Sequence, residues 1–144
     1  MRRDAKNPNW RKGALSCWLM QGDIALKSGA KEQALQLAQR SATAAGQLHS
    51  GDSVSDGFAA AKAYLLLGDA QRDLGDLNAA RASWSQALAV IPARVPLRPD
   101  EIASHARVLS RLGRQAEASS LQARLRSMGY RTLGLNSVSE ERPK

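Results

Sequence analysis

The chain has 144 residues, one cysteine and a formal net charge of +8 at pH 7. This length allows one domain with its own hydrophobic core, and the cysteine count excludes a disulfide framework or a multi-cysteine zinc site. Apolar residues make up 43% and aromatic residues 4%, and because most of the apolar share is Ala and Leu, the composition favours helices packed on helices.

The N-terminal segment lacks the pattern of a signal peptide, because residues 1–9 are mainly charged and polar and contain no apolar stretch. No run approaches the roughly 20 apolar residues that a membrane-spanning helix needs. We therefore expect a soluble, cytoplasmic protein with an N-terminal arm over residues 1–9 and no membrane association.

Six segments have helical periodicity, and they come in pairs separated by a glycine. The first pair is predicted over residues 10–27 and 31–48, and Gly29 ends its first helix because glycine readily adopts the left-handed conformation. Residues 46–56 are rich in Gly, Ser and Asp, so we expect a loop or a frayed helix end there.

The second pair is predicted over residues 57–74 and 77–91, with Gly75 between its helices. Ser55 or Asp56 is expected to cap the third helix. This predicted pair runs into Pro92.

Residues 92–98 are predicted to be a linker that leads to a third pair over about 99–128. Pro99 stands at the first helical position, where proline is accepted, and Asp100 and Glu101 follow in the first turn. Gly113 separates the fifth and sixth helices, Gly129 ends the sixth, and a flexible tail is expected over 132–144.

The glycines between paired helices are 46 and 38 residues apart, so the pairs form a repeat of irregular length. The middle pair has a large residue followed by Leu-Gly in its first helix, then Ala and an aromatic residue in its second helix, and a closing proline. The residues of this pattern are Tyr64, Leu67, Gly68, Gly75, Ala80, Trp84, Ala87 and Pro92. Weaker copies are Trp18, Gly22, Gly29 and Ala34 in the first pair and Ala106, Gly113 and Ala118 in the third.

This pattern resembles the tetratricopeptide repeat. The resemblance implies an all-α fold, a right-handed superhelical stack of three hairpins (an α-solenoid) over residues 10–131, with hairpins at 10–48, 57–91 and 99–128. It implies small residues at the helix crossing, Gly68 and Ala80, with Trp84 filling the gap toward the next hairpin. The chain is also similar to the repeat tails of larger bacterial signalling proteins.

The resemblance further implies a protein-binding scaffold whose concave groove is lined by the first helix of each pair. The groove residues expected from it are Leu19, Asp23, Lys27, Lys62, Leu65, Asp69, Arg72, Ala103, Arg107 and Arg111. Asp23 and Asp69 would repel the acidic C-termini of heat-shock chaperones, so we expect basic and apolar partner side chains there and acidic ones near Arg107. Replacing both aspartates with Lys is expected to alter binding and leave stability nearly intact.

Three alternatives remain for the surface. The groove residues fit an unused solvated face as well, and weak self-association through an exposed end helix is a further possibility. The excess of basic residues permits binding to nucleic acid or to an acidic partner; it includes Arg114, Arg124, Arg126 and Arg131. Those arginines recur at helical spacing, which also fits a solvated face, and no repeated base-reading positions are present.

No catalytic, metal or cofactor site is predicted. Cys17 with His49 or His105 is a conceivable nucleophile and base, but Cys17 is expected to be a buried structural residue. Two distant histidines make a poor metal site, and His105 is expected to be a core or interface histidine satisfied by a hydrogen bond. Trp10, Trp18 and Trp84 are expected to serve in packing rather than in base stacking.

Overall fold

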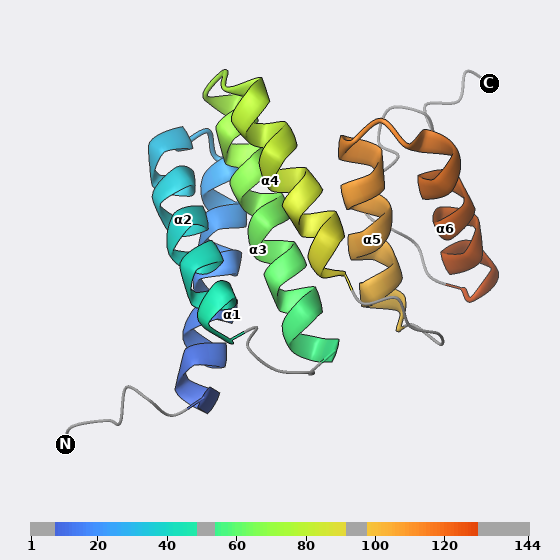
Figure 1. Cartoon of the computed structure of the whole chain (residues 1–144), viewed down its shortest axis with the longest axis horizontal. Coiled ribbons are helices and arrows are strands. Elements are labelled where there is room, and N and C mark those ends of the chain that lie inside the picture. Colours follow the sequence, from blue (N-terminus) through green and yellow to red (C-terminus); the bar gives the residue numbers. More distant parts are fainter. Residues whose placement is uncertain (1–7, 49–53, 92–97, 130–144) are drawn as a thin grey trace. The chain divides into compact units, whose positions relative to one another are not determined.

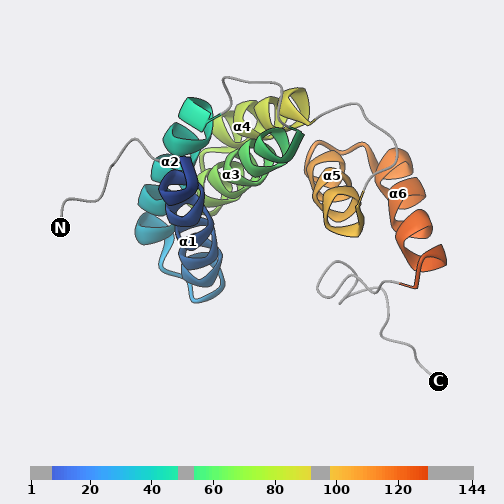
Figure 2. The same ribbon diagram turned by 90° about the horizontal axis from the view of Figure 1, so that it is seen from below.

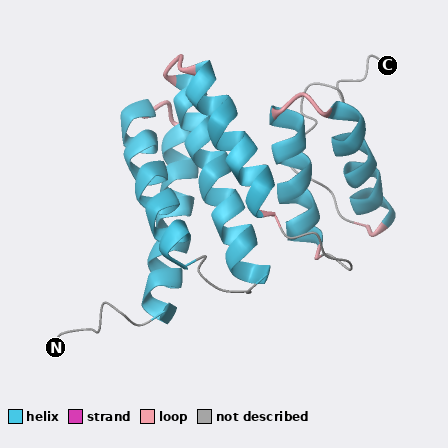
Figure 3. Cartoon of the chain, viewed as in Figure 1, coloured by secondary structure: helices cyan, strands magenta, loops and turns pink. Residues whose placement is uncertain are grey.

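The computed structural model describes residues 8–48, 54–91 and 98–129. Within these ranges every regular element is an α-helix, as Figure 3 shows, so the predicted all-α class is confirmed. The chain divides into two compact units, residues 1–92 and residues 93–144. The superhelical stack of all three hairpins and its handedness stay predictions.

The first unit consists of two helical hairpins (Figure 1). Helices α1 (Pro8–Lys27) and α2 (Lys31–Leu48) form one hairpin, and α3 (Val54–Asp73) and α4 (Leu77–Val90) form the other. Each of these helices packs against the next one along the chain, and α1 also contacts α3. Figure 2 shows the first hairpin beside the second.

Helix α2 ends at Leu48, the last helical residue expected from the sequence, whereas α3 begins earlier than expected. Because α3 begins at Val54, Ser55 and Asp56 lie inside it, and the prediction that one of them caps it is wrong. Packing explains the early start of α3, because Gly57 and Phe58 in its first turns are buried. Helix α1 likewise begins at Pro8, within the predicted arm.

The glycines that end the first helix of each pair adopt the left-handed conformation, with φ of 82° at Gly29, 91° at Gly75 and 79° at Gly113. In the first turn the Gly29 N–H donates to the Leu26 carbonyl (3.2 Å) and the Ala30 N–H donates to the Ala25 carbonyl (2.9 Å). The same pair of hydrogen bonds recurs at the other two turns. This is the Schellman motif, and the predicted helix ends at these glycines are confirmed.

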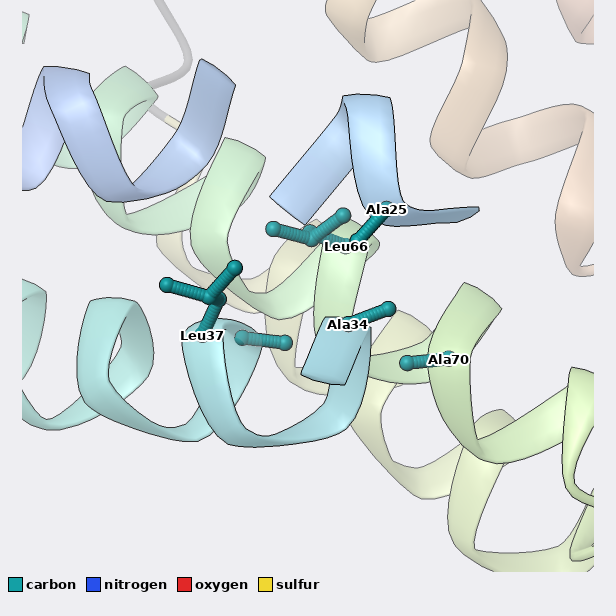
Figure 4. Packing of buried hydrophobic residues seen from close by; sticks show 6 residues of the cluster. Ala25, Ala34, Leu37, Leu66 and Ala70 are labelled. Carbon is teal, nitrogen blue, oxygen red and sulfur yellow. The ribbon is translucent and has the colours of Figure 1, made fainter. Parts of the chain in front are cut away.

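Mostly small side chains line the contact that α3 makes with α1 and α2. The buried cluster there consists of Ala25, Ala34, Leu37, Ala38, Leu66 and Ala70, of which Figure 4 labels all but Ala38. A second cluster contains Leu15, Ala45, Ala60 and Ala63. Because alanines allow two helix axes to approach closely, the two hairpins pack tightly with few large side chains.

The crossing of α3 and α4 leaves no room for a side chain at Gly68. A Cβ atom there would overlap the Trp84 ring and would lie 3.0 Å from the Ala80 carbonyl oxygen. The expected need for small residues at Gly68 and Ala80 is thereby explained. Trp84 packs against α3 of its own hairpin, whereas its expected place was the gap toward the next hairpin.

In the first hairpin the space above the equivalent glycine, Gly22, is filled from a different helix. Ala38 stands where Trp84 stands in the second hairpin, so the space above Gly22 is not filled from α2. A Cβ atom at Gly22 would lie 2.5 Å from a methyl group of Leu66, which comes from α3. Figure 4 shows Leu66 between the ribbons of α1 and α2. Leu66 therefore joins the two hairpins.

The second unit is one hairpin of α5 (Pro99–Arg111) and α6 (Gln115–Ser127). Pro99 occupies the first helical position, as predicted, and the Glu101 carboxylate accepts hydrogen bonds from the Arg98 N–H (2.9 Å) and Nε (3.0 Å). This closes the N-terminus of α5. The buried apolar residues of the unit are Ile102, Ala106, Val108, Leu109, Ala118 and Leu125.

Two packing predictions are wrong. Cys17 is exposed rather than buried, and Trp10 is 47% exposed rather than packed. Both lie on the side of α1 that faces away from the buried residues Leu15 and Gly22. Pro92, the predicted closing residue of the middle repeat, and most of the predicted linker lie outside the described residues.

Candidate partner-binding surface

The predicted groove residues of the first unit lie on α1 and α3, two helices that contact each other. Helix α1 carries Leu19, Asp23 and Lys27, and α3 carries Lys62, Leu65, Asp69 and Arg72. Spacings of three and four residues place each set on one face of its helix. The remaining predicted residues, Ala103, Arg107 and Arg111, lie on α5 of the second unit.

These residues differ in what they offer to a partner. Asp23, Lys27, Lys62 and Arg72 are exposed, and Leu19 is half-buried. Leu65 is only 8% exposed, so it belongs to the core and presents little surface. The contact surface in the first unit is therefore mainly charged.

Asp23 forms an ion pair within its own helix. Its carboxylate lies 2.8 Å from the Lys27 ammonium, and both side chains are more than half exposed. Exposed pairs of this kind contribute less than about 1 kcal/mol, so a partner can exchange this contact for its own at little cost.

Asp69 has a structural role that the sequence analysis missed. Its carboxylate accepts a hydrogen bond from Nε1 of Trp84 at 3.1 Å, and Trp84 is 3% exposed. A buried indole N–H needs an acceptor, and Asp69 supplies it across the helix crossing. The Arg72 guanidinium lies 6.0 Å from the centre of the Trp84 ring, which is within range of a cation–π interaction.

Asp23 and Asp69 therefore differ although they occupy equivalent places in their hairpins. Asp69 contacts an indole, whereas the residue in the first hairpin that corresponds to Trp84 is Ala38, which offers no donor. The expectation that a change to Lys leaves stability intact is therefore kept for Asp23 alone. The contact was predictable, because a residue directly after Gly68 lies beside any large side chain that packs on that glycine.

In the second unit, one of the arginines is already paired with a carboxylate. The Arg114 guanidinium lies 2.7 and 2.9 Å from the two carboxylate oxygens of Glu117. His105 is half-buried, and this burial lowers the pKa of its imidazole below 6.5, with Glu117 raising it and Arg114 lowering it further. Arg107 is exposed on the same helix.

A shallow hollow of about 440 Å³ lies on the surface of α1 and α2, lined by Trp18, Gln36, Gln39, Arg40, Thr43, Ala44 and Gln47. None of the predicted groove residues lines it. Trp18 also packs against the core cluster of Ala34 and Ala38, so its ring is half-buried. The predicted packing role of Trp18 accounts for its position.

The described ranges contain no group of three or more His, Cys, Asp or Glu residues that could hold a metal ion. Among the same residues, no helix has the length and apolar character required to cross a membrane. Cys17 and His105 belong to different units.

Comparison with known proteins gives one family. Residues 61–94, which include most of α3 and all of α4, match the family model of the tetratricopeptide repeat. No curated protein and no solved structure gave a significant match. The matched range begins seven residues before Gly68 and contains the Gly68–Trp84 crossing, so the resemblance seen in the middle hairpin is confirmed.

Proposed function

We propose that this chain, which carries a tetratricopeptide repeat at residues 61–94, binds a segment of a partner protein across the exposed face of α1 and α3. Tetratricopeptide repeats are in general protein–protein interaction modules without catalytic activity. The observation that carries the proposal is the matched repeat itself, whose first helix has the exposed cations Lys62 and Arg72 on one face.

The chemistry of this face indicates an acidic partner segment. Leu65 is buried and Asp69 accepts the hydrogen bond of Trp84, so neither is a main contact. The predicted groove residues of the first unit that remain exposed are Asp23, Lys27, Lys62 and Arg72, three cations and one anion, and Arg72 also lies 3.4 Å from the Asp73 carboxylate. We therefore revise the expected preference for basic side chains near Asp69 and expect carboxylates near Lys62 and Arg72.

Site-specific photo-crosslinking tests this function. A photoreactive amino acid at Lys62 is compared with the same group at Arg81, an exposed residue of α4 outside the α1 and α3 face. Crosslinking is carried out in lysate with and without nuclease. The proposal expects a protein adduct at position 62 that survives nuclease and is absent at position 81.

Charge reversal gives the matched control. Lys62→Glu is expected to abolish the adduct formed by a photoreactive group at Asp23, whereas Arg81→Glu, the same charge change on α4, should leave it intact. Equal loss in both variants would show that net charge rather than this face matters. Adducts that disappear with nuclease would favour the alternative, a basic surface that binds nucleic acid.

A further inference from the structure

Helix α1 has an exposed apolar stripe on the side opposite its buried residues. Its members, spaced by three or four residues, are Trp10, Gly13, Cys17, Met20 and Ile24, and we refer to them as the outer α1 face. Trp10 is 47%, Met20 67% and Ile24 59% exposed, although most large apolar side chains of the first unit are covered. Large exposed apolar side chains in a row are typical of a contact surface.

In the second hairpin, the residues equivalent to the outer α1 face are covered by a neighbouring helix. The residues of α3 equivalent to Cys17, Met20 and Ile24, found 46 residues later, are Ala63, Leu66 and Ala70. All three are buried, and Leu66 and Ala70 pack with Ala34, Leu37 and Ala38 of α2, as Figure 4 shows in part. The outer α1 face thus occupies the place at which α3 receives a neighbouring helix.

We propose that a second copy of this chain covers the outer α1 face, with the two α1 helices antiparallel about a two-fold axis. This surface shares Lys27 with the α1 and α3 face proposed for the partner protein, but its apolar residues lie outside that face. A two-fold contact uses the same residues of both copies, so the face must be complementary to itself.

The order of residues along the face fits an antiparallel pair. A two-fold axis between Cys17 and Met20 places Ile24 of one copy over Gly13 of the other, where a Cβ atom would have no neighbour within 4 Å. It also places the Lys27 ammonium against the Trp10 ring of the second copy, a cation–π arrangement. Cys17 then packs beside Met20.

A parallel pair lacks this complementarity. It would set Lys27 against Lys27, which is repulsive, and Gly13 against Gly13, which leaves an unfilled gap beside two tryptophans. The antiparallel arrangement avoids both. Because one helix pair is smaller than a standard protein interface, the dimer should be weak and should form only at high protein concentration.

Sedimentation equilibrium of the full chain from micromolar to millimolar concentration is the first test. We expect reversible dimerisation that Met20→Gln with Ile24→Gln weakens at least tenfold. The matched control is Leu74→Gln with Leu77→Gln, which changes two leucines that are 41% and 47% exposed near the turn between α3 and α4. All these side chains are exposed, so helical circular dichroism should be unchanged.

A wild-type chain that stays monomeric throughout overturns the proposal and leaves a helix of another protein as the occupant. A dimer that survives the Met20 and Ile24 changes, or that the control weakens equally, also overturns it.

Disulfide trapping tests the antiparallel geometry. In a Cys17→Ser background, Gly13→Cys and Ile24→Cys are made separately; the two positions are about 16 Å apart along α1. Oxidation of the mixed variants should give a disulfide-linked dimer, because position 13 of one copy meets position 24 of the other. Each variant oxidised alone should remain monomeric. Efficient trapping of either variant alone would overturn the antiparallel arrangement.

Discussion

Gly68 and Gly22 occupy equivalent places in the two hairpins, but an added methyl group would meet different neighbours. At Gly68 it would overlap the Trp84 ring and approach the Ala80 backbone, neither of which can move easily. We expect Gly68→Ala to lower the free energy of unfolding by about 1–3 kcal/mol. At Gly22 the obstacle is the end of the flexible Leu66 side chain, so Gly22→Ala should cost clearly less.

Urea unfolding of both variants measures this difference. A Gly68→Ala variant as stable as wild type would contradict the packing of Trp84 on α3. Gly22→Ala is the matched control, because it makes the same chemical change at the equivalent place of α1.

The hydrogen bond between Asp69 and Trp84 leads to a second prediction at the scale of residues. Asp69→Ala leaves the buried indole N–H without its acceptor and should lower the free energy of unfolding by about 1–3 kcal/mol. Asp69→Asn keeps an acceptor oxygen and should cost less. Asp23→Ala removes only an exposed ion pair, and its effect should stay within about 1 kcal/mol. Thermal melts of the three variants decide between a structural and a purely binding role for Asp69.

His105 should make stability depend on pH. Burial lowers its pKa below 6.5 in the folded state, so the unfolded chain binds the proton more tightly. The folded state therefore loses stability as the pH falls from above 6.5 through the lowered pKa. We expect the melting temperature of His105→Gln to fall less than that of wild type over this range.

At the scale of elements, the glycine turns were the most predictable feature. Gly75 has φ of 91° and a Cβ atom there would have no neighbour within 4 Å, so only its backbone conformation requires glycine. Gly75→Ala should lower the free energy of unfolding by about 1–2 kcal/mol, because a residue with a side chain is strained in the left-handed conformation. Gly13 lies inside α1 and is equally uncrowded, so Gly13→Ala should raise the free energy of unfolding by about 0.5–1 kcal/mol. Melts at micromolar concentration, where self-association is negligible, would reveal whether the two changes have opposite signs.

The start of α3, which lies within the segment predicted as a loop or a frayed helix end, was the least predictable element boundary, because local composition and tertiary packing oppose each other there. Gly46 and Ser55 favour a loop, but both lie inside helices. Burial of Ala45, Gly57 and Phe58 holds the adjoining turns in helical form. A sequence pattern shows the propensity of these residues but does not show which neighbouring helix covers them.

At the scale of the whole molecule, the sequence predicts the pairing of helices better than the use of their surfaces. The repeat frame located the crossing at Gly68 and Ala80 and the helix-ending glycines, but it placed Trp84 toward the next hairpin instead of on α3. It could not show that Leu65 is buried or that Asp69 holds an indole, because both depend on the side chains across each crossing. The expectation that Cys17 is buried, which came from its mid-helix position beside Trp18, is wrong because Cys17 lies on the exposed side of α1.

The net charge of +8 gives the last prediction, which concerns the whole chain. Because the excess cations are spread over both units and Arg114 is already paired with Glu117, binding to nucleic acid should be weak and independent of sequence. The affinity for a labelled duplex, measured by fluorescence anisotropy, should fall at least tenfold between about 50 and 200 mM salt. Arg124→Ser with Arg126→Ser should reduce that salt dependence only slightly. Tight binding that persists at the higher salt and prefers one sequence would instead make nucleic acid the partner.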